Sequence, residues 1–410
     1  MSTRPARGSC FGKAMERLKV MTIVGTRPEL IKLCRVIAEL DATLRHVLAH
    51  TGQNHDYELN EIFFRELEIR RPDHFLDAAG DTPMQTVGSV LTAADALMAA
   101  EQPDALLLLG DTNSCLAAIA AKRRKIPVFH MEAGNRCFDF NVPEELNRRI
   151  IDHIADFNLV YTEHARRHLI SEGLPHRRIY LTGSPMREVL DHYAEKIEAS
   201  SVLEETGLER GKYFVASFHR EENVDRPGNL EKITSVLEQL SSQYRQPVVV
   251  STHPRTRKRL EEAGVDQTNP HILYLKPFGF TDYVHLQKHA RCTISDSGTI
   301  SEESAILSFP AVSIRQSMER PEAQDAGTII LTGFDPERVL DSIAMVMAEH
   351  QGTGQGVLPG AGGSSLRSSE GTSPGSSQRS SEGTSPGSSQ RSSQGAPPGA
   401  PPDSGQGALQ

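Results

Sequence analysis

Several features that would assign this chain to a broad class of protein are missing from its 410 residues. No apolar run approaches the roughly 20 residues that span a bilayer, so we expect no membrane segment. The first twenty residues are basic but lack the apolar stretch of a secretory signal. A formal net charge of -9 argues against nucleic acid as the main partner.

Cofactor signatures are missing as well. No G-x-G-x-x-G follows a predicted strand, so the dinucleotide fingerprint is absent and we expect no NAD. No H-E-x-x-H or comparable ligand spacing predicts a metal site. The cysteines are odd in number and show no C-x-x-C spacing, which indicates reduced thiols in a cytoplasmic protein. They are Cys10, Cys34, Cys115, Cys137 and Cys292.

The last part of the chain differs in composition from the rest. From about Gly352 it consists mainly of Gly, Ser, Pro and Gln, and the unit SSEGTSPGSSQR at Ser368 is repeated from Ser380. Such a segment buries too little apolar surface to offset its ordering entropy, so we expect disorder. The predicted organisation is an N-terminal extension (1–14), two folded domains (15–185 and 186–350) and a low-complexity tail (351–410).

Between these ends, short β-rich apolar runs alternate with longer helical patterns, which is typical of parallel sheets wound with helices. A helix is expected from Pro28 to Leu40. The expected strands are Leu18–Gly25, Arg45–Gly52, Asp104–Asp111, Ile126–Gly134, Phe157–Glu163, Arg178–Pro185, Lys212–His219, Gln246–His253, His271–Pro277, Arg291–Gly298 and Pro310–Arg315. This predicts an α/β fold of two Rossmann-like domains that face each other across a cleft.

Polar clusters follow many of these strands, where open α/β sheets bind ligands. They are GTRPE, GDTNS, HMEAGNR, SFHREEN, STHPR and SDSGTISEE. In the last cluster, Gly298 precedes a predicted helix whose N-terminus could hold a diphosphate, although an ordinary N-cap explains the same residues. Arg27 and Lys32 could clamp a phosphate, or could simply be a solvated pair.

Acidic residues form a second pattern. Asp111 and Glu132 follow strands, and Glu144 and Glu145 begin a predicted helix. Carboxylates that share one cleft acquire different pKa values and can serve as acid and base, yet each alone is more often a cap or an ion-pair partner. His219 adds a group that titrates near neutral pH. His130 and His253 also end strands, and a packed core histidine explains His130 equally well.

The ordered set VGTRPELIKL, LLGDTNS, HMEAGNR, PEELNRR, FHREEN, SDSGTISEE and ERPEA resembles the non-hydrolysing UDP-N-acetylglucosamine 2-epimerase family, from about Lys19 to Glu349. The resemblance implies a fold of the glycosyltransferase-B type, a UDP-sugar substrate, no cofactor and a homodimer. It implies that UDP is eliminated and then added back while carbon 2 is inverted. By motif, the catalytic residues would be Asp111, Glu132, Glu144 and His219. The UDP-contacting residues would be Arg27, Lys32, Ser297, Gly298, Thr299, Glu303 and Arg320, with Phe278 and Tyr283 at the uracil.

Within this family, HTGQNHDYELNEIFF, EAGNRCFDFNVPEELNRRIIDH, SFHREENVD and STHPRTRKRL resemble the branch that makes UDP-N-acetyl-L-fucosamine from UDP-2-acetamido-2,6-dideoxy-β-L-talose for O-antigen or capsule. The short spacing between EAGNR and PEE favours this branch. The alternatives are UDP-N-acetylglucosamine 2-epimerase, which gives UDP-N-acetylmannosamine, a glycosyltransferase of the same fold, or an inactive sugar-nucleotide-binding relic. Thr299 stands where the family more often has glycine. Repeats follow His350, where the family has a long helix that packs back across both domains.

Overall fold

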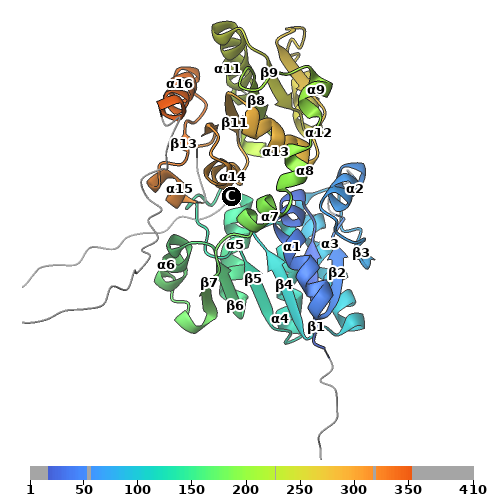
Figure 1. The fold of residues 1–410 in the computed structure, drawn as a ribbon. Coiled ribbons are helices and arrows are strands. Elements are labelled where there is room, and N and C mark those ends of the chain that lie inside the picture. Colours follow the sequence, from blue (N-terminus) through green and yellow to red (C-terminus); the bar gives the residue numbers. More distant parts are fainter. Residues whose placement is uncertain (1–16, 53–56, 227, 317–319, 353–410) are drawn as a thin grey trace, which may run out of the picture. The chain divides into compact units, whose positions relative to one another are not determined.

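The computed structural model describes residues 17–52, 57–226, 228–316 and 320–352. Their helices and strands alternate along the chain, as the sequence predicts (Figure 1). The predicted extension (1–14) and almost all of the predicted tail (351–410) lie outside the described residues. None of the described helices is long and apolar enough to cross a membrane.

The first sheet has seven parallel strands in the order β3-β2-β1-β4-β5-β6-β7. The strands are β1 (Lys19–Val24), β2 (Arg45–His50), β3 (His74–Phe75), β4 (Ala105–Leu109), β5 (Val128–Met131), β6 (Phe157–Val160) and β7 (Ile179–Leu181). The helices are α1 (Arg27–Thr43), α2 (Tyr57–Glu66), α3 (Pro83–Glu101), η1 (Asn113–Leu116, a 3-10 helix), α4 (Ala117–Arg123), α5 (Pro143–Ile154), α6 (Glu163–Ser171) and η2 (His176–Arg178, also 3-10).

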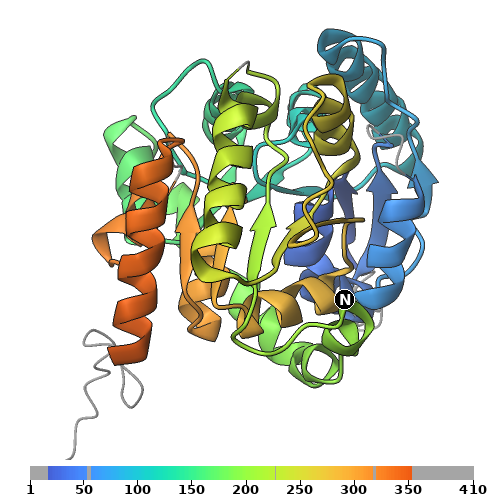
Figure 2. The ribbon, with the colours of Figure 1, turned by 90° about the horizontal axis from the view of Figure 1, so that it is seen from above.

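The second sheet has six parallel strands in the order β10-β9-β8-β11-β12-β13. Its strands are β8 (Phe214–Ser217), β9 (Val248–Ser251), β10 (Ile272–Leu275), β11 (Cys292–Ser295), β12 (Ala311–Ser313) and β13 (Ile330–Leu331). The remaining helices are α7 (Met186–His192), α8 (Ala194–Glu198), α9 (Val202–Thr206), α10 (Glu221–Val224), α11 (Asn229–Tyr244), α12 (Pro254–Glu262), α13 (Phe280–His289), α14 (Ile300–Leu307), α15 (Pro321–Asp325) and α16 (Pro336–Gly352). Figure 2 shows α16 beside α11, against which it packs.

Burial explains why these runs form parallel strands. In β4 the leucines Leu106 to Leu109 are all buried, because helices cover both faces of the sheet. The prediction of two parallel-sheet α/β halves is confirmed. Each predicted strand contains an observed one, although the observed strands are shorter. The two-residue strands β3 and β13 were not predicted, because runs of this length carry no periodic signal.

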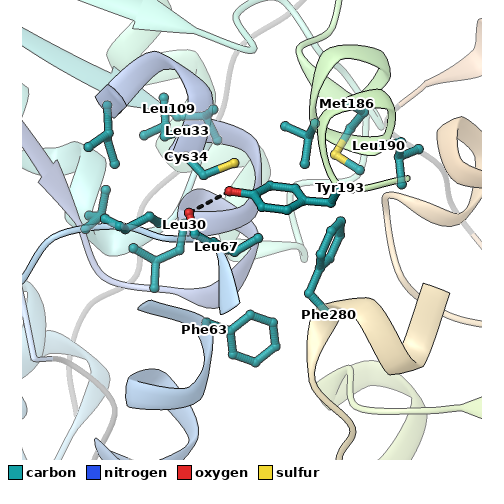
Figure 3. Packing of buried hydrophobic residues seen from close by; sticks show 14 of the residues in the cluster. Leu30, Leu33, Cys34, Phe63, Leu67, Leu109, Met186, Leu190, Tyr193 and Phe280 are labelled. Carbon is teal, nitrogen blue, oxygen red and sulfur yellow. Dashed lines mark hydrogen bonds between the residues drawn. The ribbon is translucent and has the colours of Figure 1, made fainter. Parts of the chain in front are cut away.

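A core cluster joins segments that are far apart in the sequence. Tyr193, which follows α7, is buried among α1 side chains, and its hydroxyl donates to the Leu67 carbonyl at 2.6 Å (Figure 3). Phe280 from α13 packs edge-on against the Tyr193 ring, with 5.9 Å between ring centroids. The segment that follows β7 therefore packs against α1 of the first half and α13 of the second. The domain boundary near residue 186 stays a prediction.

Candidate active site

Glu29 accepts hydrogen bonds from two loops at the edge of the first sheet, the loop after β1 and the loop after β4. Its buried carboxylate accepts from the Gly25 and Thr26 amides at 2.8 and 2.7 Å, and from the Thr26 hydroxyl at 2.8 Å. The Thr112 hydroxyl, in the loop after β4, donates to the other oxygen at 3.0 Å. Burial raises the pKa of Glu29 to about 7, although these donors act in the opposite direction. Glu29 thus fixes the loop that carries Arg27 against the loop that carries Asp111.

Glu132 lies between two cations that come from distant parts of the chain. Lys32, buried on α1, approaches one carboxylate oxygen at 2.6 Å, and Arg320, which precedes α15, pairs with the other. Burial alone would raise the pKa of Glu132, but the two cations outweigh it and lower the pKa to about 2. The carboxylate is therefore ionised and firmly held. Its backbone φ of +62° lies in the left-handed region, which is unusual for a non-glycine residue.

Asp111 lies on the neighbouring strand end and pairs with Arg148 of α5 at 2.6 Å. Arg148 also pairs with the buried Glu145 at 2.6 Å, and Arg149 approaches the other Glu145 oxygen at 2.8 Å. Glu145 therefore holds two arginines in place. Its neighbour Glu144 is only half-buried in the first turn of the same helix. The two acidic residues thus differ in burial, and Glu145 shares Arg148 with Asp111.

His130 is a core residue, as one of its two interpretations proposes. It is fully buried, with Nδ1 at 2.9 Å from Asp152 and Nε2 at 2.7 Å from the Gly110 carbonyl. Although burial lowers its pKa, Asp152 and the carbonyl outweigh burial and raise it. Both neighbours accept hydrogen bonds, so both ring nitrogens donate. Arg136 pairs with the same Asp152 at 2.7 Å, and this buried set supports the loop that carries Glu132.

In the second sheet, His219 is oriented by Asp296. The His219 Nδ1 lies 2.9 Å from the Asp296 carboxylate, which also accepts from the His219 and Arg220 amides at 3.0 Å each. The Asn223 side chain donates to it at 2.7 Å. Burial would raise the pKa of Asp296, but His219 and Arg220 lower it well below its usual range. Asp296 therefore stays ionised and fixes the tautomer and the angle of the His219 ring.

The turn after β11 forms the predicted glycine-containing loop. The Ser297 hydroxyl lies 3.0 Å from that of Thr299, and the Ser297 amide donates to the Ser295 hydroxyl at 3.0 Å. A Cβ on Gly298 would lie 3.6 Å from the Arg220 guanidinium, an ordinary contact, so space does not exclude a side chain there. Thr299 then precedes α14. The loop brings a helix start and Arg220 to the same place, which suits an anion.

Two acidic residues follow in α14. Glu302 pairs with Arg320 at 2.7 Å, and the buried Glu303 accepts from Gln287 at 3.0 Å. Burial raises the pKa of Glu303, with its hydrogen bonds acting in the opposite direction. Arg320 therefore links Glu302 of one half to Glu132 of the other.

The remaining residues that the sequence predicts at UDP are Phe278, Tyr283 and Arg27. Phe278 and Tyr283 belong to one apolar cluster, and the Tyr283 hydroxyl donates to Ser217 at 2.8 Å. Arg27 lies over the Phe63 ring at 5.7 Å. Burial, together with the charges of Arg27 and His219, lowers the pKa of His253 to about 4. The His219 and His253 rings lie 6.4 Å apart between their centroids.

Two residues that hold the site, Glu29 and Asp296, stand inside the quoted motifs but are not predicted to have a role. Glu145 is predicted, and the ion-pair interpretation is the one that the structure shows for it. The spacing of Thr26 and Glu29 is that of a capping box, which could have identified Glu29. Asp296 depends on a contact with a residue 77 positions away, which no local pattern reveals.

A cavity of about 310 Å³ is lined by none of the predicted site residues, but its lining includes Asn223, which donates to Asp296. One wall comes from the loop before α5, with Asp139, Asn141 and Pro143, and the other includes Asp225 and Arg226. Pro143 directly precedes Glu144, so the cavity reaches the start of α5. Both walls combine polar side chains with apolar ones, Val142 and Phe334, as many ligand sites do.

The chain matches the family described as UDP-N-acetylglucosamine 2-epimerase over residues 38–359. It is 35% identical over 340 residues to UDP-N-acetylglucosamine 2-epimerase of Methanococcus maripaludis, covering 81% of this chain and 93% of that protein. It is 32% identical over 360 residues to UDP-2,3-diacetamido-2,3-dideoxy-D-glucuronate 2-epimerase of Pseudomonas aeruginosa, covering 86% and 99%.

Solved structures that are similar to this chain include further UDP-N-acetylglucosamine 2-epimerases. UDP-N-acetylglucosamine 2-epimerase from Rickettsia bellii is 53% identical, with a TM-score of 0.77 and coverage of 82% of this chain and 89% of that one. The Methanocaldococcus jannaschii enzyme in complex with UDP-GlcNAc and UDP is 32% identical, also with a TM-score of 0.77, covering 80% and 93%. These neighbours share the two-sheet fold of the glycosyltransferase-B type.

Proposed function

Because the chain belongs to the UDP-N-acetylglucosamine 2-epimerase family, we propose that it is an isomerase that inverts carbon 2 of a UDP-linked N-acetylamino sugar. The observation that carries this proposal is the placement of Glu132 between Lys32 and Arg320. This arrangement combines a carboxylate for proton transfer with two cations for a diphosphate.

The chemistry requires more than a simple proton exchange, because the hydrogen on carbon 2 is not next to a carbonyl. We propose that a base removes this proton while the bond from carbon 1 to the UDP oxygen breaks, leaving a double bond between carbons 1 and 2. UDP then adds back to carbon 1, and an acid returns a proton to the opposite face of carbon 2. Asp111, Glu132 and Glu144 are the proposed acid and base residues.

Bound substrate would change the charge balance at Glu132. A diphosphate competes for Lys32 and Arg320, so its arrival removes the charges that hold the pKa of Glu132 near 2. The carboxylate would then become a stronger base at the moment when the substrate is in place. The same two cations would stabilise the negative charge on the departing UDP.

The second half would hold the nucleotide. His219, oriented by Asp296, is proposed to lie at the leaving diphosphate, with Arg27 nearby. Ser297, Gly298, Thr299 and Glu303 would contact the UDP, and Phe278 and Tyr283 the uracil. Burial raises the pKa of the Glu303 carboxyl, which accepts from Gln287 at 3.0 Å.

For the sugar, we propose UDP-2-acetamido-2,6-dideoxy-β-L-talose, converted to UDP-N-acetyl-L-fucosamine. The support is the sequence of the segments around EAGNR and FHREEN, together with the short loop before α5 that borders the cavity. The alternative is UDP-N-acetylglucosamine, the substrate in the names of the Methanococcus and Rickettsia proteins. We also propose that the protein is a homodimer in the cytoplasm and makes precursors of O-antigen or capsule.

Incubation with each UDP-sugar in deuterated water, without NAD, tests these statements. Inversion of carbon 2 with one deuterium incorporated there, seen by NMR, is the expected result for the talose substrate. Inversion of UDP-N-acetylglucosamine alone would select the alternative substrate and keep the reaction. Transfer of either sugar to an acceptor, or no inversion of either, would reject the epimerase proposal.

A further inference from the structure

A group of ligand-type side chains lies apart from the proposed active site. Glu198, His285 and His289 place their ligand atoms within 4.8 Å of one another. Glu198 ends α8, and the two histidines stand one turn apart on α13. Among the described residues, no other group of three or more Asp, Glu, His or Cys side chains has its ligand atoms so close together.

We infer that Glu198, His285 and His289 bind one divalent metal ion of the zinc type. Two imidazoles and one carboxylate are a donor set that suits zinc and related transition metals, whereas magnesium and calcium prefer oxygen ligands alone. Three protein ligands leave a fourth position for water. The i and i+4 spacing of the histidines places both rings on one face of the helix.

His285 is oriented as a metal-binding histidine requires. Its ring is buried, and Nδ1 lies 2.6 Å from the Ile197 backbone carbonyl. A carbonyl only accepts, so Nδ1 carries the proton and Nε2 keeps its lone pair. A hydrogen bond from the other ring nitrogen to a backbone carbonyl fixes both the tautomer and the ring angle of a metal ligand. The Nε2 atom of His285 is therefore already oriented to donate its lone pair to a metal ion.

His289 has a buried ring nitrogen for which the described residues offer no hydrogen-bond partner. This atom, Nε2, lies 3.8 Å from the Glu198 carboxylate, beyond hydrogen-bonding distance. Leaving such a group unsatisfied costs free energy, which a coordinated ion would recover. The other nitrogen, Nδ1, lies 3.3 Å from the exposed Arg210. When metal binds Nε2, the proton moves to Nδ1 and the Arg210 side chain turns toward solvent.

Lys288 competes for the site. Its ammonium group pairs with Glu198, so it occupies the carboxylate that the metal would use. A metal ion therefore has to displace an exposed lysine, which limits its affinity. Removing the lysine charge should strengthen binding, a result that a merely structural salt bridge would not give.

The ion would join α8, in the segment that follows the first sheet, to α13, which follows β10 of the second sheet. It would thus stabilise the packing of this connecting segment. The site takes no part in the proposed epimerisation, so its test does not depend on that proposal.

The test uses the full chain with any affinity tag removed, treated with EDTA and then titrated with CoCl2 and ZnCl2. We expect one equivalent of cobalt to bind with visible absorption bands of a tetrahedral site and without the intense thiolate band that cysteine ligands produce. Zinc should displace it and raise the melting temperature. Metal content after dialysis gives an independent readout.

Glu198→Gln and His289→Ala should each weaken binding by at least about 10-fold, the scale expected for loss of a ligand. Lys288→Gln should tighten it. His74→Ala is the matched control, because His74 also pairs with a glutamate, Glu101 at 3.0 Å, but lacks a second histidine. Unchanged binding in Glu198→Gln and His289→Ala, or no stoichiometric binding by the wild type, would overturn the inference.

Discussion

At the scale of single residues, Glu132 shows how one side chain can be both fixed and ready to react. Two buried cations hold it, and both are groups that a diphosphate would also bind. The ion pairs therefore keep the carboxylate in place until substrate arrives. Asp111 has a similar arrangement with Arg148.

The proposed proton-transfer residues can be tested with isosteric amides. Asp111→Asn, Glu132→Gln and Glu144→Gln should each lower the rate of epimerisation by about 10²-fold or more, because each removes an acid or base. UDP should still bind. The measurements are turnover by NMR and UDP affinity by calorimetry.

Glu145→Gln is the matched control, one residue away on the same helix. It breaks buried ion pairs to Arg148 and Arg149 and should therefore lower the melting temperature clearly. If Glu132→Gln and Glu144→Gln unfold early yet turn over normally, these residues are structural and the catalytic assignment is wrong.

The low pKa of Glu132 makes a prediction about acid stability. The folded-state pKa is about 2 and the ordinary value is 4.5, so the folded state favours the ionised form. The stabilisation is present in full above pH 4.5 and is lost as the pH falls toward 2, up to about 3 kcal/mol.

Urea unfolding of the ligand-free protein at several pH values from 6 to 3.5 measures this effect. The free energy of unfolding should fall more steeply with decreasing pH in the wild type than in Glu132→Gln. Parallel curves for the two proteins would mean that the cations do not perturb Glu132. Asp95→Asn, which breaks an exposed pair with Arg124, serves as the control for a surface ion pair.

At the scale of elements, the loop after β5 depends on a close approach of two backbones. A Cβ on Gly134 would lie 2.4 Å from the Ala165 carbonyl oxygen of α6, and the residue has φ of +81°. Gly134→Ala should therefore destabilise the protein by about 3 kcal/mol or more, through both a clash and backbone strain. The same change should displace Glu132, two residues earlier, and reduce turnover.

Gly173→Ala separates the two causes. Gly173 has φ of +90°, but nothing lies within 4 Å of the Cβ position, so only the strain remains, about 1 kcal/mol. Chemical unfolding of both variants gives the comparison. Equal losses of stability would show that the contact with Ala165 is not tight, and that the loop moves to accept a methyl group.

Some strands and contacts could be predicted from the sequence, and others could not. The strand from 104 to 111 is nearly all apolar, and burial on both faces makes this pattern strong. The pairing of β3 with β2 and of β13 with β12 depends on tertiary contacts, because each strand has only two residues. The loop positions of Asp111 and Glu132 follow from strand ends, whereas the ion pairs to Arg148 and Arg320 join positions 37 and 188 residues apart. Local patterns do not determine such partners.

At the scale of the whole molecule, the described chain ends with α16, which packs against α11 and β12. Val339, Ile343 and Met347 of this helix are buried in the core of the second half. The helix is therefore a structural part of that half. The low-complexity residues after it lie outside the described residues, and their composition offers almost no large apolar side chain for a further core.

Truncation after Gly352 tests the role of this segment. Because residues 353–410 contain few large apolar side chains, we expect the truncated protein to keep its melting temperature within about 2 °C and its turnover within about twofold. A second truncation after Asp335 removes α16 and is the comparison: it exposes the core side chains of the second half and should prevent stable folding. A large loss of activity or stability in the first truncation would show that the segment docks on the folded part, where the family resemblance places a closing helix.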